Sequence, residues 1–354
     1  MRSCELAVKH KLQGLELNKE LIAVCNSLID TWKEARFDDI EVSTISGGIS
    51  NALYKISIRD ESVVPKSIVL RVYGDNTEKF IDREEEVKTM STLHSHGFGP
   101  HVVGTFHNGR IESFLELTCL DPDDIAKDMF KYDIARTLAR FHLISKAWEP
   151  PTTLPTPFER VKEWLHTAKQ LDFSDNEHHM KLLEKIDVDA VLGEVDMLSH
   201  VACQLDSPAV YAHNDLLSGN IMVDVKDGRV KQMTFIDFEY ADWAPRGFDL
   251  GNHFCEYAGF DGDYSKYPER ANEFIKAYLE VYHAGRGVPT QEEIAQVVKE
   301  ANLFSLASHL YWAAWGILQA KWSSIDFDYM EYATVRLDEY YKRKSGFIDA
   351  CNIL

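Results

Sequence analysis

The pattern of hydrophobic residues changes near residue 118, and this change limits the folds that are open to the chain. Residues 40–117 contain short runs of β-forming residues separated by turns, with one helical pattern among them, IDREEEVKTMSTLHSHG. After residue 118 long helical patterns dominate, and one β-hairpin interrupts them, IMVDVKDGRVKQMTFIDFEY, with its turn at Asp227-Gly228. Sheet and helix are thus segregated along the sequence, which is typical of an α+β protein with two lobes.

Individual elements are predicted from periodicity and from turn residues. In the N-terminal part we expect a leading helix over 17–36, strands on either side of Ser46-Gly47-Gly48, a strand over 67–74 and a hairpin at Asn108-Gly109. In the C-terminal part we expect long helices over Lys131–Ser145, Phe158–Leu171, Ala271–His283 and Gln291–Trp322. This order predicts a protein-kinase-like two-lobed fold, with a small β-rich N-terminal lobe over 1–117 and a large helical C-terminal lobe over 118–354.

Composition and charge narrow the class of protein. The 354 residues carry a formal net charge of −19, so nucleic acid and anionic membranes would be repelled, and we expect neither as a partner. The most apolar stretch, Leu303 to Ala320, is interrupted by polar residues and is interpreted as a buried helix. The six cysteines lie far apart without a CxxC pair, which argues against a zinc site or a disulfide framework. The N-terminus lacks the apolar core of a signal peptide, and we expect a cytoplasmic protein.

The motif with the clearest chemistry is HNDLLSGN, residues 213–220, which lies between a helical region and the hairpin. Phosphoryl transfer of the kinase type needs a carboxylate that accepts the proton of the substrate hydroxyl, and an amide oxygen that holds Mg²⁺. Asp215 and Asn220 supply these groups on one short loop, and Asp237 follows at the end of a strand as a second magnesium ligand. A lone HND could equally be a turn, because Asn and Asp favour turns. The three residues at these spacings favour a kinase that uses ATP.

Arg71 is the candidate cation for binding the nucleotide. It lies inside an apolar strand, where a charge is costly unless it is paired or binds an anion. We predict that it contacts the α- and β-phosphates of ATP and that a glutamate of the next helix anchors it, either Glu86 or Glu85. The structural alternative is an arginine on an edge strand that faces solvent.

Backbone groups of the N-terminal lobe complete the predicted nucleotide site. The turn after the first strand would cover the phosphates with its N–H groups, although a GG turn is more often a simple hairpin. The residues expected there are Gly47, Gly48, Ser50 and Asn51. At the end of the lobe, Ser113 and Leu115 would offer backbone groups to adenine.

A polar run and a pair of tryptophans are candidates for the second substrate. For the polar residues Asp249, Asn252 and His253 a structural hydrogen-bond network is the favoured interpretation, and Glu256 is the candidate for contact with a cationic substrate. Trp312 and Trp315 lie three residues apart on one helix, and Tyr332 follows. Spaced tryptophans are by default core residues, but their ring faces also suit an alkylammonium group.

These segments resemble the signature sequences of the choline/ethanolamine kinase family. The resemblance rests on HNDLLSGN, on FIDFEY followed by RGFDLGNHFCEYAGFDGDYSKYP, and on ASHLYWAAWGILQAKWSSIDFDY, with LRVYGDNTE, DREEEV and ISGGISN in the N-terminal lobe. It runs from about residue 40 to 343, whereas the first 35 or so residues and the acidic stretch 172–196 match poorly. It implies phosphorylation of ethanolamine or choline by MgATP, which opens the synthesis of phosphatidylethanolamine or phosphatidylcholine.

The resemblance also implies roles for individual residues. Asp215 would be the base that contacts the substrate hydroxyl, and Asn220 and Asp237 would hold magnesium. Arg71 and Glu86 would form an ion pair on the phosphate side. The residues implied for the amine pocket are Glu256, Trp312, Trp315 and Tyr332.

Within the family the chain is predicted to be an ethanolamine kinase. YGDNTE, HNDLLSGN and EYAGFDGDY are more similar to ethanolamine kinases, and Ala258-Gly259 stands where choline kinases carry more aromatic residues. A choline kinase or dual enzyme is the alternative. An aminoglycoside-type phosphotransferase shares H-x-D and Asn but has no reason to keep the tryptophan pair, and an inactive binding protein would usually have lost a catalytic group. The expected partners are ATP and an amino alcohol, and a homodimer is one assembly that the sequence leaves open.

Overall fold

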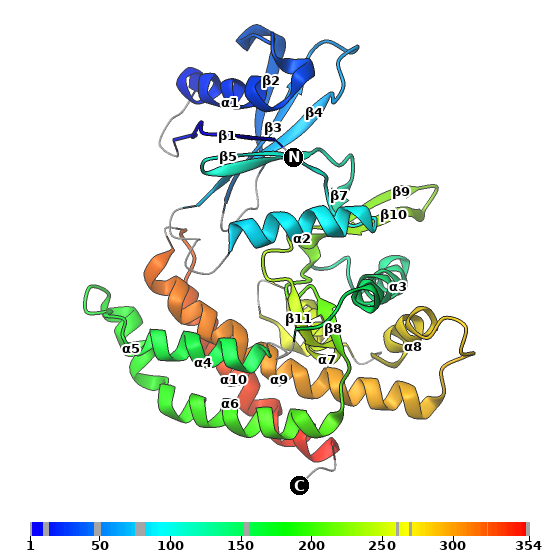
Figure 1. Cartoon of the computed structure of the whole chain (residues 1–354). Helices are drawn as coiled ribbons and strands as arrows, with labels where there is room; N and C mark the ends of the chain where they lie inside the picture. Colours follow the sequence, from blue (N-terminus) through cyan, green and yellow to red (C-terminus); the bar gives the residue numbers. More distant parts are fainter. Residues whose placement is uncertain are drawn as a thin grey trace. The chain divides into compact units, whose positions relative to one another are not determined.

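The computed structural model describes residues 2–9, 14–45, 51–74, 82–151, 156–259, 262–268, 271–323 and 325–351. The chain forms two compact units, coloured along the sequence in Figure 1. The first comprises Met1–Thr118 together with Ile236–Glu239, and the second comprises Cys119–Phe235 and Tyr240–Leu354. The sheet-rich first unit and the mostly helical second unit confirm the predicted α+β class.

The first unit is built on a six-stranded sheet with the order β1-β5-β6-β4-β3-β2. Its strands are β1 (Arg2–Cys4), β2 (Ile40–Ile45), β3 (Asn51–Ile58), β4 (Ser67–Tyr73), β5 (Val102–Phe106) and β6 (Gly109–Ser113). The strands β2 to β6 and the helix α2 (Arg83–Ser95) between β4 and β5 were all predicted from the sequence. The edge strand β1 was not, because three residues without alternation carry no pattern and their parallel partner β5 lies about 100 residues away.

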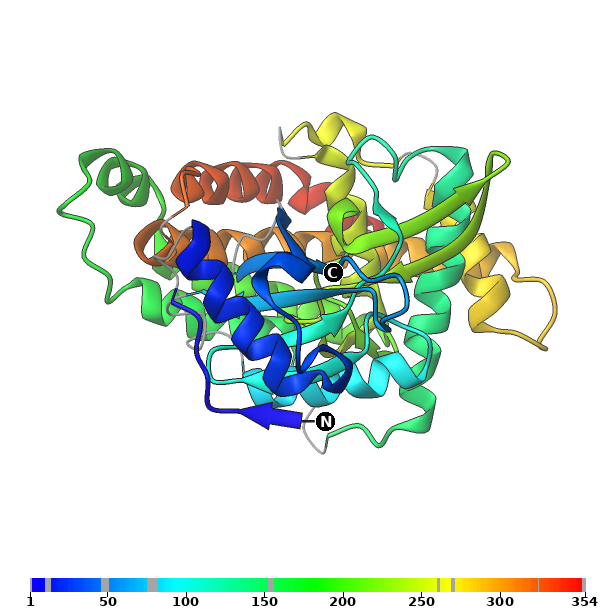
Figure 2. The ribbon, with the colours of Figure 1, turned by 90° about the horizontal axis from the view of Figure 1, so that it is seen from above.

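The leading helix covers one face of this sheet. Helix α1 (Gly14–Leu28) crosses the strands in Figure 2 and is followed by the 3₁₀ helices η1 (Asp30–Trp32) and η2 (Phe37–Asp39). The buried side chains of Leu21, Val24 and Leu28 belong to the same hydrophobic core as Ile56 and Ile68 of the sheet. The helix ends earlier than the predicted range 17–36, because the backbone turns to an extended conformation at Ile29.

The second unit is mainly helical. Its first part contains α3 (Asp128–Ile144), η4 (Ser145–Ala147), α4 (Pro157–Ala168), α5 (Glu177–Lys185), α6 (Val188–Ala202) and η5 (Cys203–Leu205), after β7 (Thr118–Cys119), at which the two units meet in the sequence. The central part contains β8 (Ala209–Ala212), η6 (Ser218–Asn220), β9 (Ile221–Lys226), β10 (Arg229–Phe235), β11 (Asp242–Pro245) and α7 (Arg246–Cys255). The last part contains η7 (Glu256–Ala258), η8 (Tyr264–Lys266), α8 (Ala271–Tyr282), α9 (Gln291–Trp322) and α10 (Tyr329–Ala350).

Helix α9 forms the centre of the second unit. It has the bounds predicted from the sequence, and it is buried on all sides from Leu303 to Leu318 because α4, α7 and α10 pack around it. The backbones of α7 and α9 approach closely at Gly251, where an added Cβ would lie 2.4 Å from the carbonyl oxygen of Ala301. A glycine is therefore required at this position, and α7 is held firmly against the central helix.

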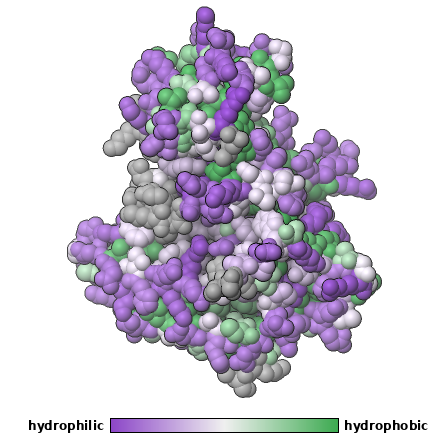
Figure 3. All heavy atoms as spheres, viewed as in Figure 1, coloured by the Kyte–Doolittle hydropathy of each residue, from purple (hydrophilic) through white to green (hydrophobic). Residues whose placement is uncertain are grey.

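The surface of the second unit is largely polar. In the face drawn in Figure 3, hydrophilic side chains cover most of the region of α4, α5 and α6, and the hydrophobic patches there are small. Among the residues that the structure describes, no helix, α9 included, is both long enough and apolar enough to cross a membrane.

Candidate active site

The loop between β8 and η6 carries the predicted catalytic residues of the second unit. The side-chain nitrogen Nδ2 of Asn220 donates to the backbone oxygen of Asp215 at 2.8 Å and to its carboxylate Oδ2 at 3.1 Å. The backbone N–H of Leu217 also donates to the Asp215 carbonyl, at 3.0 Å. The structure thus brings Asp215 and Asn220 together, and the amide oxygen is the atom with which Asn220 would bind a cation.

Asp249 of α7 holds the backbone of this loop. Its carboxylate accepts the backbone N–H groups of His213 at 2.7 Å and Asn214 at 2.9 Å, and it contacts Nε2 of His142 at 2.9 Å. Burial alone would raise the pKa of Asp249, but the bonds with His142 and His213 hold it below its usual value. Asn214 has a positive φ of 63°, so the loop takes a conformation that an isolated chain would rarely adopt. The carboxylate of Asp249 therefore fixes the backbone immediately before Asp215, and with it the position of Asp215.

The next residues of α7 extend this support. Asn252 donates through Nδ2 to the carbonyl of Asn214 at 3.2 Å, and Nδ1 of His253 lies 2.9 Å from the carbonyl of Leu216. Both side chains are fully buried. The sequence interpretation of Asp249, Asn252 and His253 as a structural network is confirmed by these bonds.

The two predicted tryptophans of α9 belong to one aromatic cluster. The centre of the Trp312 ring lies 5.3 Å from that of Trp315 and 5.4 Å from that of Tyr240. The ring centres of Trp315 and Tyr332 are 6.4 Å apart. Each indole N–H has a buried acceptor, Oδ1 of Asn252 for Trp312 at 2.7 Å and the Tyr240 hydroxyl for Trp315 at 2.9 Å. The rings are thereby locked in position. The sequence analysis did not predict Tyr240 as a member of this aromatic cluster. Its position three residues after Asp237, a predicted site residue, was a signal for it.

Tyr332 connects this cluster to two carboxylates. Burial is the main cause that raises the pKa of the Tyr332 phenol, and Glu256 and Asp215 both raise it further. The phenol is therefore within electrostatic reach of both the predicted base and the predicted amine-binding carboxylate. The structure brings Asp215, Glu256, Trp312, Trp315 and Tyr332 into one region of the second unit.

Glu256 has a charged neighbour that the sequence did not reveal. Nη1 of Arg336, on α10, lies 3.9 Å from Oε1 of Glu256. The Arg336 side chain is 2% exposed. The one sequence signal was an arginine between the apolar positions Ala333 and Leu337 of a helix, which predicts a buried cation.

In the first unit, Arg71 belongs to a larger ionic network than expected. Its Nε lies 3.2 Å from Oε1 of Glu112, and its Nη1 lies 3.5 Å from Oδ1 of Asp237. Arg71 faces Arg110 across the β4–β6 ladder, and Arg110 contacts the same Glu112 oxygen at 2.6 Å. Two neighbouring arginines on one face of a sheet repel each other unless a carboxylate lies close to both. Glu112 is that carboxylate, and it therefore pairs with Arg71 where Glu86 was predicted.

Glu86 joins the network through other arginines. Its Oε2 lies 2.7 Å from Nη1 of Arg83, and its Oε1 lies 2.9 Å from Nη2 of Arg110. The prediction of an Arg71–Glu86 pair is corrected accordingly: the two residues are linked through Arg110 and Glu112. Burial raises the pKa of Glu86, but Arg110 and Arg83 outweigh it and keep this carboxylate ionised. Glu85, the alternative anchor, is exposed and contacts Lys88.

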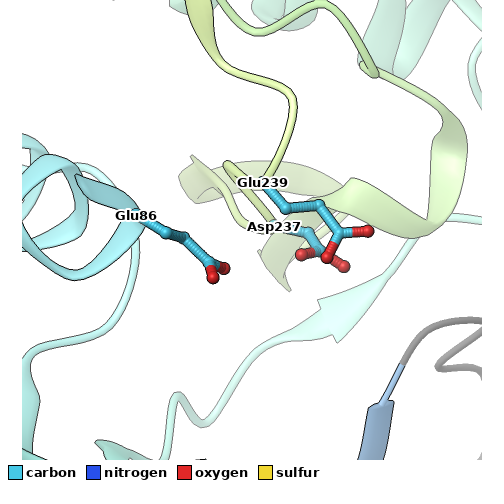
Figure 4. A group of neighbouring side chains, drawn as sticks. All are labelled: Glu86, Asp237 and Glu239. Atoms are coloured by element: carbon cyan, nitrogen blue, oxygen red, sulfur yellow. The ribbon is translucent and has the colours of Figure 1, made fainter. Parts of the chain in front are cut away.

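A cluster of carboxylates stands beside this network. One carboxylate oxygen each of Glu86, Asp237 and Glu239 lies within 4.8 Å of the others, and Figure 4 shows Glu86 pointing toward the adjacent carboxylates of Asp237 and Glu239. Burial raises the pKa of Glu239 to about 7, and the neighbouring charges of Asp237 and Glu86 contribute. Asp237 also takes a strained backbone conformation, with φ of 64°. Mutually repelling carboxylate oxygens at this spacing fit a magnesium ion, which prefers such ligands.

The sequence interpretation did not include Glu239 among the candidate metal ligands. A signal for it existed, because Glu239 stands two residues after Asp237 and side chains at that spacing point to the same side of an extended segment. The structure places both residues in the first unit, together with Arg71 and Glu86.

The backbone groups predicted to bind the nucleotide are only partly described. Gly47, Gly48 and Ser50 lie outside the described residues, whereas Asn51 begins β3 and its Oδ1 lies 3.3 Å from Nη2 of Arg83. The backbone N–H of Ser113 donates to the carbonyl of His101 at 2.8 Å. That Ser113 and Leu115 offer backbone groups to adenine stays a prediction.

Solved structures with a similar fold define the class of this protein. A Plasmodium vivax ethanolamine kinase has a TM-score of 0.79 and 28% sequence identity, covering 94% of this chain and 90% of that one. A choline kinase from Cryptosporidium parvum has a TM-score of 0.76 and 27% identity, covering 94% and 96%. A spectinomycin phosphotransferase, with a TM-score of 0.54 and 14% identity, shares the fold alone. The predicted fold of kinase-like phosphotransferases is confirmed.

The sequence comparisons identify the family within that class. The sequence model described as choline/ethanolamine kinase matches residues 42–341. A probable ethanolamine kinase of Arabidopsis thaliana is 37% identical over 329 residues, which cover 92% of this chain and 85% of that relative. A probable ethanolamine kinase A of Dictyostelium discoideum is 36% identical over 340 residues, which cover 94% of both. The chain belongs to the choline/ethanolamine kinase family, as the resemblance implied.

Proposed function

We propose that this protein transfers the γ-phosphoryl group of ATP to the hydroxyl of ethanolamine and so produces phosphoethanolamine for phosphatidylethanolamine synthesis. The observation that carries the proposal is the Asp215–Asn220 loop, which α7 fixes in the same unit as the aromatic cluster and Glu256. Relatives named ethanolamine kinases, at 34–37% identity over most of the chain, support the choice of substrate.

Asp215 would act as the general base. As the ethanolamine oxygen attacks the γ-phosphorus, Asp215 accepts the hydroxyl proton, the new oxygen–phosphorus bond forms, and the bond to the β-phosphate oxygen breaks with ADP as the leaving group. Asn220 keeps the Asp215 carboxylate in place through its Nδ2 bond. Removal of the proton in this way makes the hydroxyl a better nucleophile without a free hydroxide.

Magnesium and the phosphates would be held by charged and amide side chains. Asn220 and Asp237 are the predicted ligands, and the carboxylate cluster adds Glu239 to Asp237. Magnesium in a kinase neutralises the phosphate oxygens. Arg71, held by Glu112, would contact the phosphates, and the turn around Gly47, Gly48, Ser50 and Asn51 would cover them. Ser113 and Leu115 would offer backbone groups to adenine.

The amine would bind among the aromatic rings and Glu256. A primary ammonium group carries N–H donors that need acceptors when they are desolvated, and the Glu256 carboxylate can provide them. The faces of Trp312, Trp315 and Tyr332 would attract the positive charge as well. The same rings give a reason for choline to be a weaker, second substrate, because a trimethylammonium group relies on aromatic faces alone.

ATP consumption by the purified protein with ethanolamine, with choline and without amine tests the proposal. We expect magnesium-dependent turnover that requires an amine, with ethanolamine preferred by kcat/KM. Turnover with choline only would overturn the choice of substrate, and no amine-dependent turnover would overturn the proposed function. A homodimer and a cytoplasmic location remain predictions, which gel filtration with light scattering and cell fractionation would test.

A further inference from the structure

A buried arginine beside a binding site for a cation requires an explanation, because its charge repels the substrate. Arg336 is buried on α10, and its Nη2 donates to the hydroxyl oxygen of Ser308 at 2.6 Å. The guanidinium carbon lies 5.8 Å and 5.9 Å from the ring centres of Tyr264 and Tyr332. In the part of the chain that the structure describes, Glu256 is the carboxylate paired with it.

The distance between Arg336 and Glu256 has a specific consequence. At 3.9 Å the two charges still attract each other, but the separation is too long for a hydrogen bond. The oxygens of Glu256 therefore remain able to accept bonds from a third group. A direct bidentate pair, such as that of Arg246 with Glu300 at 3.0 Å and 2.8 Å, would occupy them.

Ser308 explains why Arg336 does not close this gap. The Ser308 hydroxyl accepts from Arg336 and donates to Oδ1 of Asn252 at 2.7 Å. Asn252 in turn donates to the carbonyl of Asn214, next to Asp215. Arg336 is thus tethered to neutral groups that also support the catalytic loop.

The surroundings of Glu256 contain few other charges. Burial raises the pKa of Glu256, and Arg336 opposes this rise. Burial raises the pKa of Cys255 to about 11, raises those of Tyr264 and Tyr332, and lowers that of His309, so these four groups are neutral near pH 7. Two further charged groups act on the same neighbours: Arg343, which donates to the carbonyl of Tyr264, and Asp215, which acts on Tyr332. Glu256 and Arg336 are the charged pair in direct contact here.

We propose that Arg336 is a positioning residue that keeps Glu256 ionised without occupying its oxygens, so that Glu256 accepts hydrogen bonds from the ammonium group of the substrate. This inference rests on the proposed function. Without Arg336 the partly buried Glu256 takes up a proton more readily, and a neutral acid is a weaker partner for a cation. Ethanolamine would then have to displace that proton in order to bind.

The test is ethanolamine binding by Arg336→Met as a function of pH, measured by the fluorescence of Trp312 and Trp315 and therefore independent of turnover. Removal of Arg336 raises the Glu256 pKa, so the dissociation constant should increase as the pH falls. We expect a loss of about 10-fold at pH 6, the equivalent of one pKa unit, and recovery of affinity toward pH 9. Arg336→Lys, which keeps the charge, should follow the wild-type curve more closely.

Matched variants separate this effect from a structural role. Arg246→Met also removes a buried arginine of the second unit and should lower stability without a pH-dependent change in affinity. In a Glu256→Gln background, Arg336→Met should cause no further pH dependence. Arg336→Gln, which can keep the Ser308 bond, gives the same measurement if the methionine variant does not fold.

The outcomes are distinguishable. An affinity loss in Arg336→Met that is equal at all pH values, or no loss, overturns the role assigned to Arg336 while the kinase proposal stands. Wild-type protein that neither binds nor phosphorylates ethanolamine overturns the proposed function instead.

Discussion

The ionic cluster of the first unit and the catalytic region of the second are built on opposite principles. The first brings together Arg71, Arg83, Arg110, Glu86, Glu112, Asp237 and Glu239 within a few ångströms, so almost every group is charged. In the second, neutral side chains and backbone groups make most of the bonds, and the charges are few. In a site that binds a metal ion and a polyphosphate, charged side chains can exchange their ion-pair partners for the ligands. In a site that moves one proton, the base must be held in one position.

Loss of the base should give the largest effect and should leave the ionic cluster intact. Asp215→Asn keeps the shape and the Asn220 contact but removes the proton acceptor, so kcat should fall by ~10²–10⁴-fold. ATP affinity should stay unchanged. Steady-state kinetics with a nucleotide-binding titration measures both, and a variant that keeps more than about a tenth of wild-type kcat would exclude Asp215 as the base.

Changes in the carboxylate cluster should appear in the magnesium dependence. Asp237→Ala removes a proposed magnesium ligand and a charge next to Arg71, so activity should fall strongly and the remaining turnover should need ~10–100-fold more magnesium. Glu239→Gln and Asn220→Ala should shift the magnesium curve in the same direction. Glu85→Gln changes an exposed carboxylate on α2, the helix that carries Glu86. It is the control and should match wild type. Unchanged magnesium curves would contradict the assignment of these ligands.

Loss of a neutral bond in the second unit should reduce stability. Asn252→Ala leaves the indole N–H of Trp312 and the hydroxyl of Ser308 without their acceptor, and it removes a donor from Asn214. Each buried group left unpaired costs ~1–3 kcal/mol, so we expect a loss of about 3 kcal/mol in the free energy of unfolding. Asn302→Ala, which loses one bond from Tyr267, is the matched control. Equal unfolding midpoints in denaturant would show that α7 does not depend on this bond.

Substrate choice should respond to Glu256 and hardly to the first unit. We expect kcat/KM for ethanolamine to exceed that for choline by at least ~10-fold, but by less than the ~10⁴-fold of a site without aromatic faces. Glu256→Gln should raise KM for ethanolamine and change KM for choline little. Competition of the two amines at saturating MgATP measures this, and an unchanged ethanolamine KM would show that Glu256 does not hold the amine.

The cysteines should give the smallest effect. Cys119→Ser and Cys203→Ser change exposed thiols outside both clusters and should leave kcat and stability within error. Cys255→Ser changes a buried thiol and should lower stability while sparing the chemistry. Inactivation of the folded protein by an exposed change would reveal a role for a thiol.

Local patterns predicted the strands β2 to β6 and the helices α3, α4, α8 and α9, but not α5, α6, α7 or α10. The bounds of α9 and the spacing of Asp215, Asn220 and Asp237 follow from periodicity and from a motif, which are visible within one segment. The ionic partners could not be predicted in the same way. Glu86 was predicted as the ion-pair partner of Arg71 by analogy with kinases. The β4–β6 register instead places Arg110 opposite Arg71, and Glu112 forms ion pairs with both arginines. The pairing of Arg336 with Glu256 could not be predicted either, because Glu256 lies 80 residues earlier in the chain.

The four residues Ile236–Glu239 belong to the first unit although the chain enters and leaves them from the second. A single cut after Thr118 would therefore not release an intact N-terminal half. The fragment 1–118 would lack Asp237 and Glu239, and the buried Arg71 would keep its contact with Glu112 but lose its contact with Asp237. Splitting the gene at this point should yield an N-terminal product that folds poorly alone, and co-expression with residues 119–354 should restore it.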